Sequence, residues 1–137
     1  MKKKVKIILA VILSLVFVTY IVLFGCKETH ISDNATVKLK YNYLATRFKQ
    51  TLTEEETAKV ISILDGKTYY ASPIDTPYCG FDYRIAIVVN GRVFGVACDG
   101  CNVLIDYTNL RCFDVSQEDI EYLHSLFASY GGHFPCI

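Results

Sequence analysis

The sequence lacks the local signatures with which common enzyme classes position their reactive groups. Its 137 residues contain no GxSxG nucleophile elbow, no HExxH zinc motif, no P-loop and no GxGxxG dinucleotide fingerprint. They also contain no internal repeat and no low-complexity tract. These absences favour a protein that is not an enzyme, although the cysteines described below leave that question open.

Acidic residues are absent from the first 25 residues, which hold four of the 14 Lys and Arg. The whole chain has 14 basic and 14 acidic residues, so the part after position 25 is mildly acidic. We find no Lys/Arg cluster in that part, and neutralising phosphates requires a basic patch. We therefore expect no nucleic-acid partner.

The first 25 residues follow the pattern of an export signal. Residues 1–6 supply a basic flank, and residues 7–24 form an apolar run that only Ser14 and Thr19 interrupt. As a helix this run is about 27 Å long at ~1.5 Å per residue, which is enough to span a bilayer. The basic flank keeps its own end in the cytoplasm, so a cleaved signal peptide and an uncleaved signal-anchor both export the rest of the chain.

The leader ends at Leu23-Phe24-Gly25-Cys26, where an aliphatic residue lies three positions before a cysteine and a small residue lies directly before it. This segment resembles the lipobox of bacterial lipoproteins. The resemblance implies cleavage before Cys26, a diacylglycerol on its thiol, and a protein held by lipid on the outer side of the cell membrane. A plain signal-anchor whose helix ends at Gly-Cys is the alternative.

The remainder reads as one domain. The short polar segment 26–35 suits a tether, and we expect 36–137 to form a single extracytoplasmic α+β domain, an antiparallel β-meander with two amphipathic helices packed on one face. Alternating apolar and polar residues predict a strand over 36–43. Capping signals and helically spaced apolar residues predict helices over 54–65 and 117–130.

Hairpin turns are predicted at Asn90-Gly91, at Asp99-Gly100 and, with a weaker signal, at Thr108-Asn109. Two-residue loops fix the strand register. The second loop then pairs Cys98 with Cys101, and it places Phe94 opposite Ile105.

Five cysteines follow Cys26, an odd number that implies two disulfides and one free thiol, or a use other than disulfides. These candidate disulfide or thiol residues are Cys79, Cys98, Cys101, Cys112 and Cys136. We interpret them as structural cysteines of a small exported domain, and we expect no cofactor.

The motif Cys98-Asp99-Gly100-Cys101 permits a second interpretation. A hairpin CxxC is how zinc knuckles hold two ligands, and His133 and Cys136 offer another pair at the same spacing. Redox catalysis is less favoured, because it needs the CxxC at a helix N-terminus. The alternative is therefore a thiol- or zinc-dependent extracytoplasmic protein that uses Cys98 and Cys101.

The favoured function is a membrane-tethered binding module with an unknown protein or small-molecule partner. One candidate surface is an unpaired sheet edge, which can accept a partner strand. The other is a loop with Tyr69, Tyr70 and Tyr78, which Pro73 and Pro77 stiffen.

Overall fold

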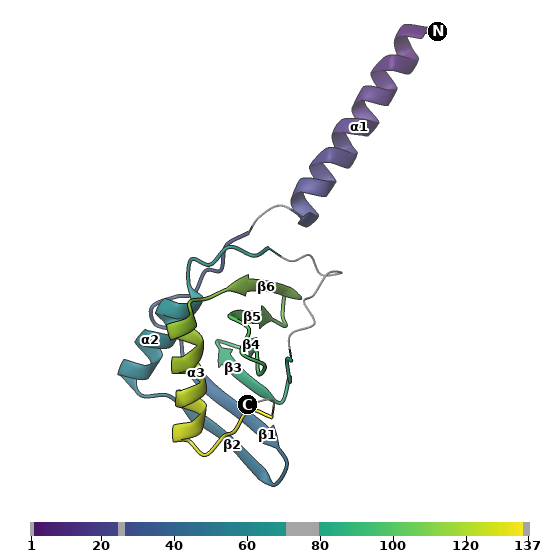
Figure 1. Cartoon of the computed structure of the whole chain (residues 1–137). Helices are drawn as coiled ribbons and strands as arrows, with labels where there is room; N and C mark the ends of the chain where they lie inside the picture. The colour runs from purple at the N-terminus through teal and green to yellow at the C-terminus, as the bar shows by residue number, and fades with distance from the viewer. Residues whose placement is uncertain (1, 25–26, 71–79, 136–137) are drawn as a thin grey trace.

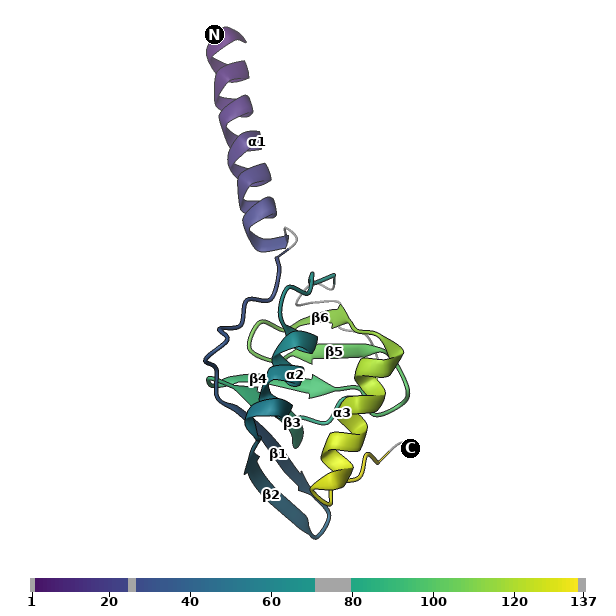
Figure 2. The same cartoon turned by 90° about the vertical axis from the view of Figure 1, so that its left-hand side faces the viewer.

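The structure, a computed structural model, describes residues 2–24, 27–70 and 80–135 (Figure 1). The N-terminal residues form helix α1 (Lys2–Phe24), which extends away from the rest of the chain in both views (Figures 1 and 2). Within the described ranges, no helix meets the length and hydropathy required of a membrane span. Cys26, the predicted lipid attachment site, lies outside the described residues.

Six antiparallel strands form one sheet in the order β2-β1-β3-β4-β5-β6. The strands are β1 (Val37–Tyr43), β2 (Thr46–Thr51), β3 (Ile85–Val89), β4 (Arg92–Val96), β5 (Val103–Asp106) and β6 (Arg111–Asp114). Strands β3 to β6 follow one another as a meander, and the β1–β2 hairpin joins the sheet at β3. The predicted α+β class with a β-meander is confirmed.

Helices α2 (Glu54–Leu64) and α3 (Gln117–Ser129) lie on the same side of the sheet (Figures 1 and 2). The predicted capping box of α2 is present, because Thr53 accepts a hydrogen bond from the Glu56 N–H and the Glu56 carboxylate accepts one from the Thr53 N–H at 2.8 Å. Both helices were predicted within one residue of these bounds.

The main core lies between the helices and the sheet face that they cover. Its largest fully buried side chains include Leu39, Leu64, Phe94, Phe113 and Phe127, from three strands and both helices. Each such side chain stabilises the fold by about 1.5–3 kcal/mol through removal of apolar surface from water. We call this face of the sheet the inner face and the opposite one the outer face.

The β3–β4 hairpin, formed at the first predicted turn, has the predicted register. Val89 lies opposite Arg92, and the turn residues Asn90 and Gly91 both adopt positive φ, 47° and 86°. The third turn is also confirmed, since Asp106 lies opposite Arg111.

The register across the second turn was predicted wrongly. Phe94 lies opposite Asp106 and not opposite Ile105, and the Ala97 N–H donates to the Val103 carbonyl at 3.3 Å. The loop is one residue longer than assumed, because the Asp99 carboxylate accepts from the Cys101 N–H and so draws Cys101 into the loop.

A slip of one residue moves every side chain of the following strand to the opposite face. Leu104 therefore joins the main core, whereas Ile105 packs with Cys112 in a small cluster on the outer face. The predicted register would have placed Asp106 and Phe94 on different faces of the sheet. In the structure Asp106 is the cross-strand partner of Phe94, lies with it on the inner face and is fully buried.

The segment interpreted as a tether lies along the domain. Thr29 is fully buried, its N–H donates to Lys67 O at 2.8 Å, and its hydroxyl donates to the Leu64 carbonyl. Glu28 forms a β-bridge with Thr68. The described part of this segment, residues 27–35, therefore packs against the domain through specific contacts.

Candidate functional site

Three of the candidate cysteines lie in the described residues. Cys98 and Cys112 are buried, and Cys101 is half-buried. The Cys98 thiol donates to the Gly80 carbonyl, next to the hydrogen bond from its own N–H to the same oxygen at 2.9 Å. Cys79 and Cys136 lie outside the described residues, so the cysteine pairing stays a prediction.

The zinc alternative requires Cys98, Cys101, His133 and Cys136 to meet. Among the residues that the structure describes, no three His, Cys, Asp or Glu side chains come together as a metal site. The main chain of His133 is bonded to Tyr41 on β1, whose hydroxyl donates to the His133 carbonyl at 2.7 Å. The C-terminal segment thus packs on the β1 strand.

Of the three tyrosines predicted to form an aromatic binding loop, Tyr69 is buried in the core. Tyr69 is 5% exposed and belongs to the main core, where its ring packs edge-on against Phe113. Tyr70 is 52% exposed, and its N–H donates to the Cys112 carbonyl of the edge strand β6. Tyr78 lies outside the described residues. Tyr69 is therefore a core residue and not a surface contact.

A buried charged cluster surrounds Asp106 at the end of β5. One carboxylate oxygen accepts hydrogen bonds from Tyr69 Oη at 2.5 Å, Arg92 Nη2 at 2.8 Å and Asn109 Nδ2 at 2.7 Å. Arg92 also donates from Nη1 to the His30 carbonyl at 2.9 Å. The cluster therefore fastens the N-terminal segment to the sheet.

The protonation states in this cluster are fixed at neutral pH. Burial raises the pKa of Asp106, but hydrogen bonds from Arg92, Tyr69 and Asn109 outweigh it and hold the pKa below its ordinary value. Burial, followed by the hydrogen bond to Asp106, raises the pKa of Tyr69 to about 12. An ionised carboxylate and a neutral phenol make a strong structural hydrogen bond and are not poised for proton transfer.

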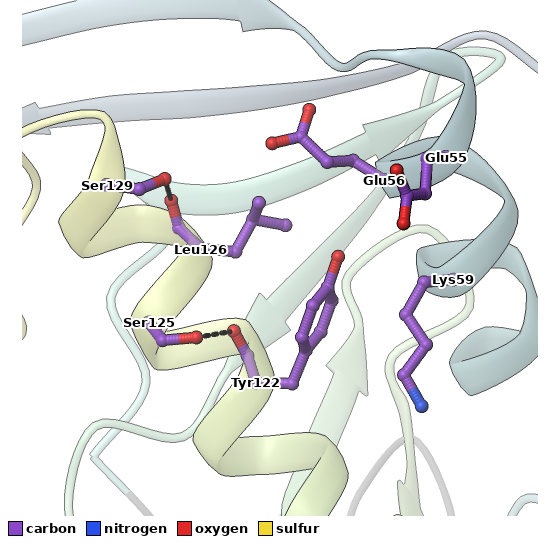
Figure 3. Close-up of a pocket in the computed structure, with 7 residues that line it drawn as sticks. All are labelled: Glu55, Glu56, Lys59, Tyr122, Ser125, Leu126 and Ser129. Carbon is purple, nitrogen blue, oxygen red and sulfur yellow. Dashed lines mark hydrogen bonds between the residues drawn. The ribbon is translucent and has the colours of Figure 1, made fainter.

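A groove of about 570 Å³ lies between α2 and α3 (Figure 3). Leu126 and the Tyr122 ring point into the groove (Figure 3), and most polar groups on its rim are already hydrogen-bonded or ion-paired within the helix pair. Glu56 caps α2 and accepts from the Tyr130 hydroxyl at 2.9 Å, and Lys59 pairs with Asp119 at 3.4 Å. We therefore regard this groove as the packing seam of the two helices.

The β1–β2 hairpin carries the most exposed surface of the sheet. Five of the six residues of β2 are exposed, and the strand pairs on one side only, with β1. Its single apolar side chain, Phe48, stacks on the Tyr41 ring at a centroid distance of 5.1 Å on the inner face.

Four cations lie on the outer face of this hairpin. The register places Lys40 directly opposite Lys49, and Lys38 on β1 and Arg47 on β2 each lie two residues earlier in their strands. Residues 34–53 contain these four basic residues and no acidic one. The expectation that the domain has no basic cluster was therefore wrong, because the four residues are dispersed in sequence and only strand pairing brings them together.

Searches of the whole chain against protein-family models, curated proteins and solved structures found no match.

Proposed function

We propose that the protein is a membrane-anchored extracytoplasmic binding module, held by lipid at Cys26, that contacts its partner with the outer face of the β1–β2 hairpin. The anchoring part rests on the basic flank, the apolar run and the Leu23-Phe24-Gly25-Cys26 segment. The binding part rests on one observation, the set of four cations on the outer face of the hairpin that form no ion pair with any carboxylate of the described residues.

The position of this face supports the proposal. Helices α2 and α3 cover the inner face, and no helix or strand of the described residues lies over the outer face of the hairpin (Figures 1 and 2). In both views the hairpin lies at the end of the domain opposite to α1. A domain fastened near its anchor by residues 27–31 would present this end to the surroundings of the membrane.

Lysine labelling tests the exposure and the contact together. A membrane-impermeant amine reagent is applied to intact cells and to the purified full-length protein, and each labelled lysine is quantified by mass spectrometry. We expect Lys38, Lys40 and Lys49 to be labelled less in cells than in the purified protein, because the partner covers them. Lys67, which lies on another part of the domain, is the matched control and should be labelled equally in both.

Two results would contradict the proposal. Absence of labelling at Lys67 in intact cells would place the domain on the other side of the membrane. Equal labelling of all four lysines in cells and in solution would show an uncovered hairpin.

Mass spectrometry of the mature N-terminal peptide tests the anchor separately. We expect a peptide that begins at Cys26 and carries a diacylglycerol. An intact segment from Met1 through Cys26 would support the signal-anchor instead.

A further inference from the structure

The four cations of the hairpin differ in their pairing from three other basic residues of the domain, Lys59, Arg84 and Arg92. Lys59, Arg84 and Arg92 each form an ion pair with an aspartate, at 3.4, 2.6 and 2.8 Å. By contrast, within the described ranges none of the four hairpin cations forms an ion pair with a carboxylate. These four hairpin cations are Lys38, Lys40, Arg47 and Lys49.

This arrangement carries an electrostatic cost in the isolated protein. Like charges directly opposite each other across an antiparallel pair are destabilising, and Lys40 lies opposite Lys49. Charged side chains on an edge strand protect it against aggregation, which accounts for Arg47 and Lys49 on β2. It does not account for Lys38 and Lys40, because β1 is paired on both sides. An anionic partner would remove the repulsion.

The surface between two of the cations is hollowed, which leaves room for an anionic group. A recess of about 280 Å³ opens between Lys38 and Lys49, beside the Asn90-Gly91 turn, and Thr36 and Val88 complete its lining. Lys40 and Arg47 continue the row of cations along the strands. Alternate residues of a strand lie about 6.6 Å apart at ~3.3 Å per residue. The four cations therefore occupy three successive cross-strand positions along the hairpin: Lys38, then Lys40 with Lys49, then Arg47.

We infer that the partner is a linear polymer of the cell envelope that bears a phosphate-type anion on each repeat, and that it runs along the β1–β2 strands. The inference rests on the proposed function, since it names the partner of the same surface. The recess receives one anion, and Lys40 and Arg47 meet the anions that follow. An isolated anion would occupy only the recess and would leave Arg47 without an anion.

Two other polyanions fit the surface less well. Proteins that bind single-stranded nucleic acid combine cations with aromatic side chains on which the bases stack. The aromatic residues of this hairpin, Tyr41 and Phe48, stack on each other on the inner face instead. An anionic bilayer around α1 is also disfavoured, because the hairpin lies at the opposite end of the domain (Figures 1 and 2).

The test uses the full-length protein in a neutral detergent with long-chain inorganic polyphosphate as the probe, measured by calorimetry at several salt concentrations. We expect binding that weakens as salt rises, and much weaker binding of inorganic monophosphate. Lys40→Gln and Lys49→Gln should each weaken polyphosphate binding by up to about fivefold, the range of an exposed ion pair. Each should also reduce the slope of log K against log salt concentration by about one.

Lys67→Gln is the control, because it removes the same charge from a different part of the domain and should leave the affinity within about twofold. Circular dichroism confirms that each variant is folded. Polyphosphate binding that both hairpin variants leave unchanged would overturn the inference.

Tighter binding of a single-stranded polynucleotide than of polyphosphate of equal charge would assign the surface to nucleic acid and overturn the inference. Binding to phosphatidylglycerol vesicles that polyphosphate does not displace would assign it to lipid, with the same consequence. If lysine protection in cells is observed but polyphosphate does not bind, the proposed function stands and the polymer assignment fails.

Discussion

Replacing Asp106 with Asn tests whether the buried charged cluster holds the N-terminal segment on the sheet. The substitution keeps the shape of the side chain but removes its charge. Tyr69 Oη, Arg92 Nη2 and Asn109 Nδ2 then compete for one neutral carbonyl oxygen in a site where Asp106 is fully buried. Each loses its hydrogen bond to an ionised carboxylate, and Arg92 loses its ion pair.

The expected cost is about 3 kcal/mol of unfolding free energy. Breaking a fully buried ion pair typically costs about 3–5 kcal/mol. The lower end applies here, because the Arg92 side chain is 27% exposed and regains some hydration. For a domain of this size the change corresponds to a decrease of roughly 12 °C in Tm.

The assay is urea unfolding of the full-length protein in neutral detergent, followed by circular dichroism at neutral pH. Asp114→Asn is the control, because it removes an exposed carboxylate from β6 and should change stability by less than about 0.5 kcal/mol. Combining Asp106→Asn with Tyr69→Phe should cost less than the sum of the single changes, since the two residues share a hydrogen bond. Equal destabilisation by Asp106→Asn and Asp114→Asn would refute the reasoning.

Three further predictions follow from single positions. Gly95→Val should lower stability by about 1–3 kcal/mol in the same urea assay, because a Cβ atom there would lie 2.6 Å from the Tyr107 ring; an unchanged midpoint would contradict the close packing. Tyr69, whose pKa is raised from 10.0 to about 12, contributes stability that is present below pH 10 and is lost as the pH rises from 10 to 12; Tyr69→Phe should abolish that part of the loss. Asp106, whose pKa is lowered from 3.8, contributes stability that is lost below pH 3.8, so wild type and Asp106→Asn should converge in acid and not at neutral pH.

Local sequence signals predicted the elements whose ends are marked by capping or turn residues. The capping box of Thr53 and Glu56 located α2, and the Asn90-Gly91 dipeptide located the first hairpin turn with its register. In each case the residues that set the backbone conformation are adjacent in sequence. The α+β class followed from these elements.

Strand β2 was not predicted, because neither the turn before it nor its own residue pattern is typical of a β-hairpin. The turn before it places Leu44 at a φ of 51°, a conformation that normally calls for Gly or Asn. The strand itself has one apolar residue, Phe48, because it lies at the sheet edge with most of its side chains exposed. Without this strand, no pairing partner for Lys40 could be predicted, and the cation row remained hidden.

The Asp106 cluster was missed for a different reason. One extra loop residue at Cys101 reversed the faces of β5, and this reversal is decided by a side-chain contact of Asp99 that the turn dipeptide does not encode. The contacts of Tyr69 and Arg92 with Asp106 span 37 and 14 residues. Such contacts depend on the complete topology and not on a local pattern.

The most direct test of the central claim is photo-cross-linking of the full-length protein in intact cells. A photoreactive amino acid replaces Lys49 on the outer face of the hairpin or, as a control, Glu121 on the exposed side of α3. We predict a cross-linked species of higher mass from position 49 and none from position 121. Cross-linking at position 121 with none at position 49 would show that the helix side, and not the hairpin, is the binding surface.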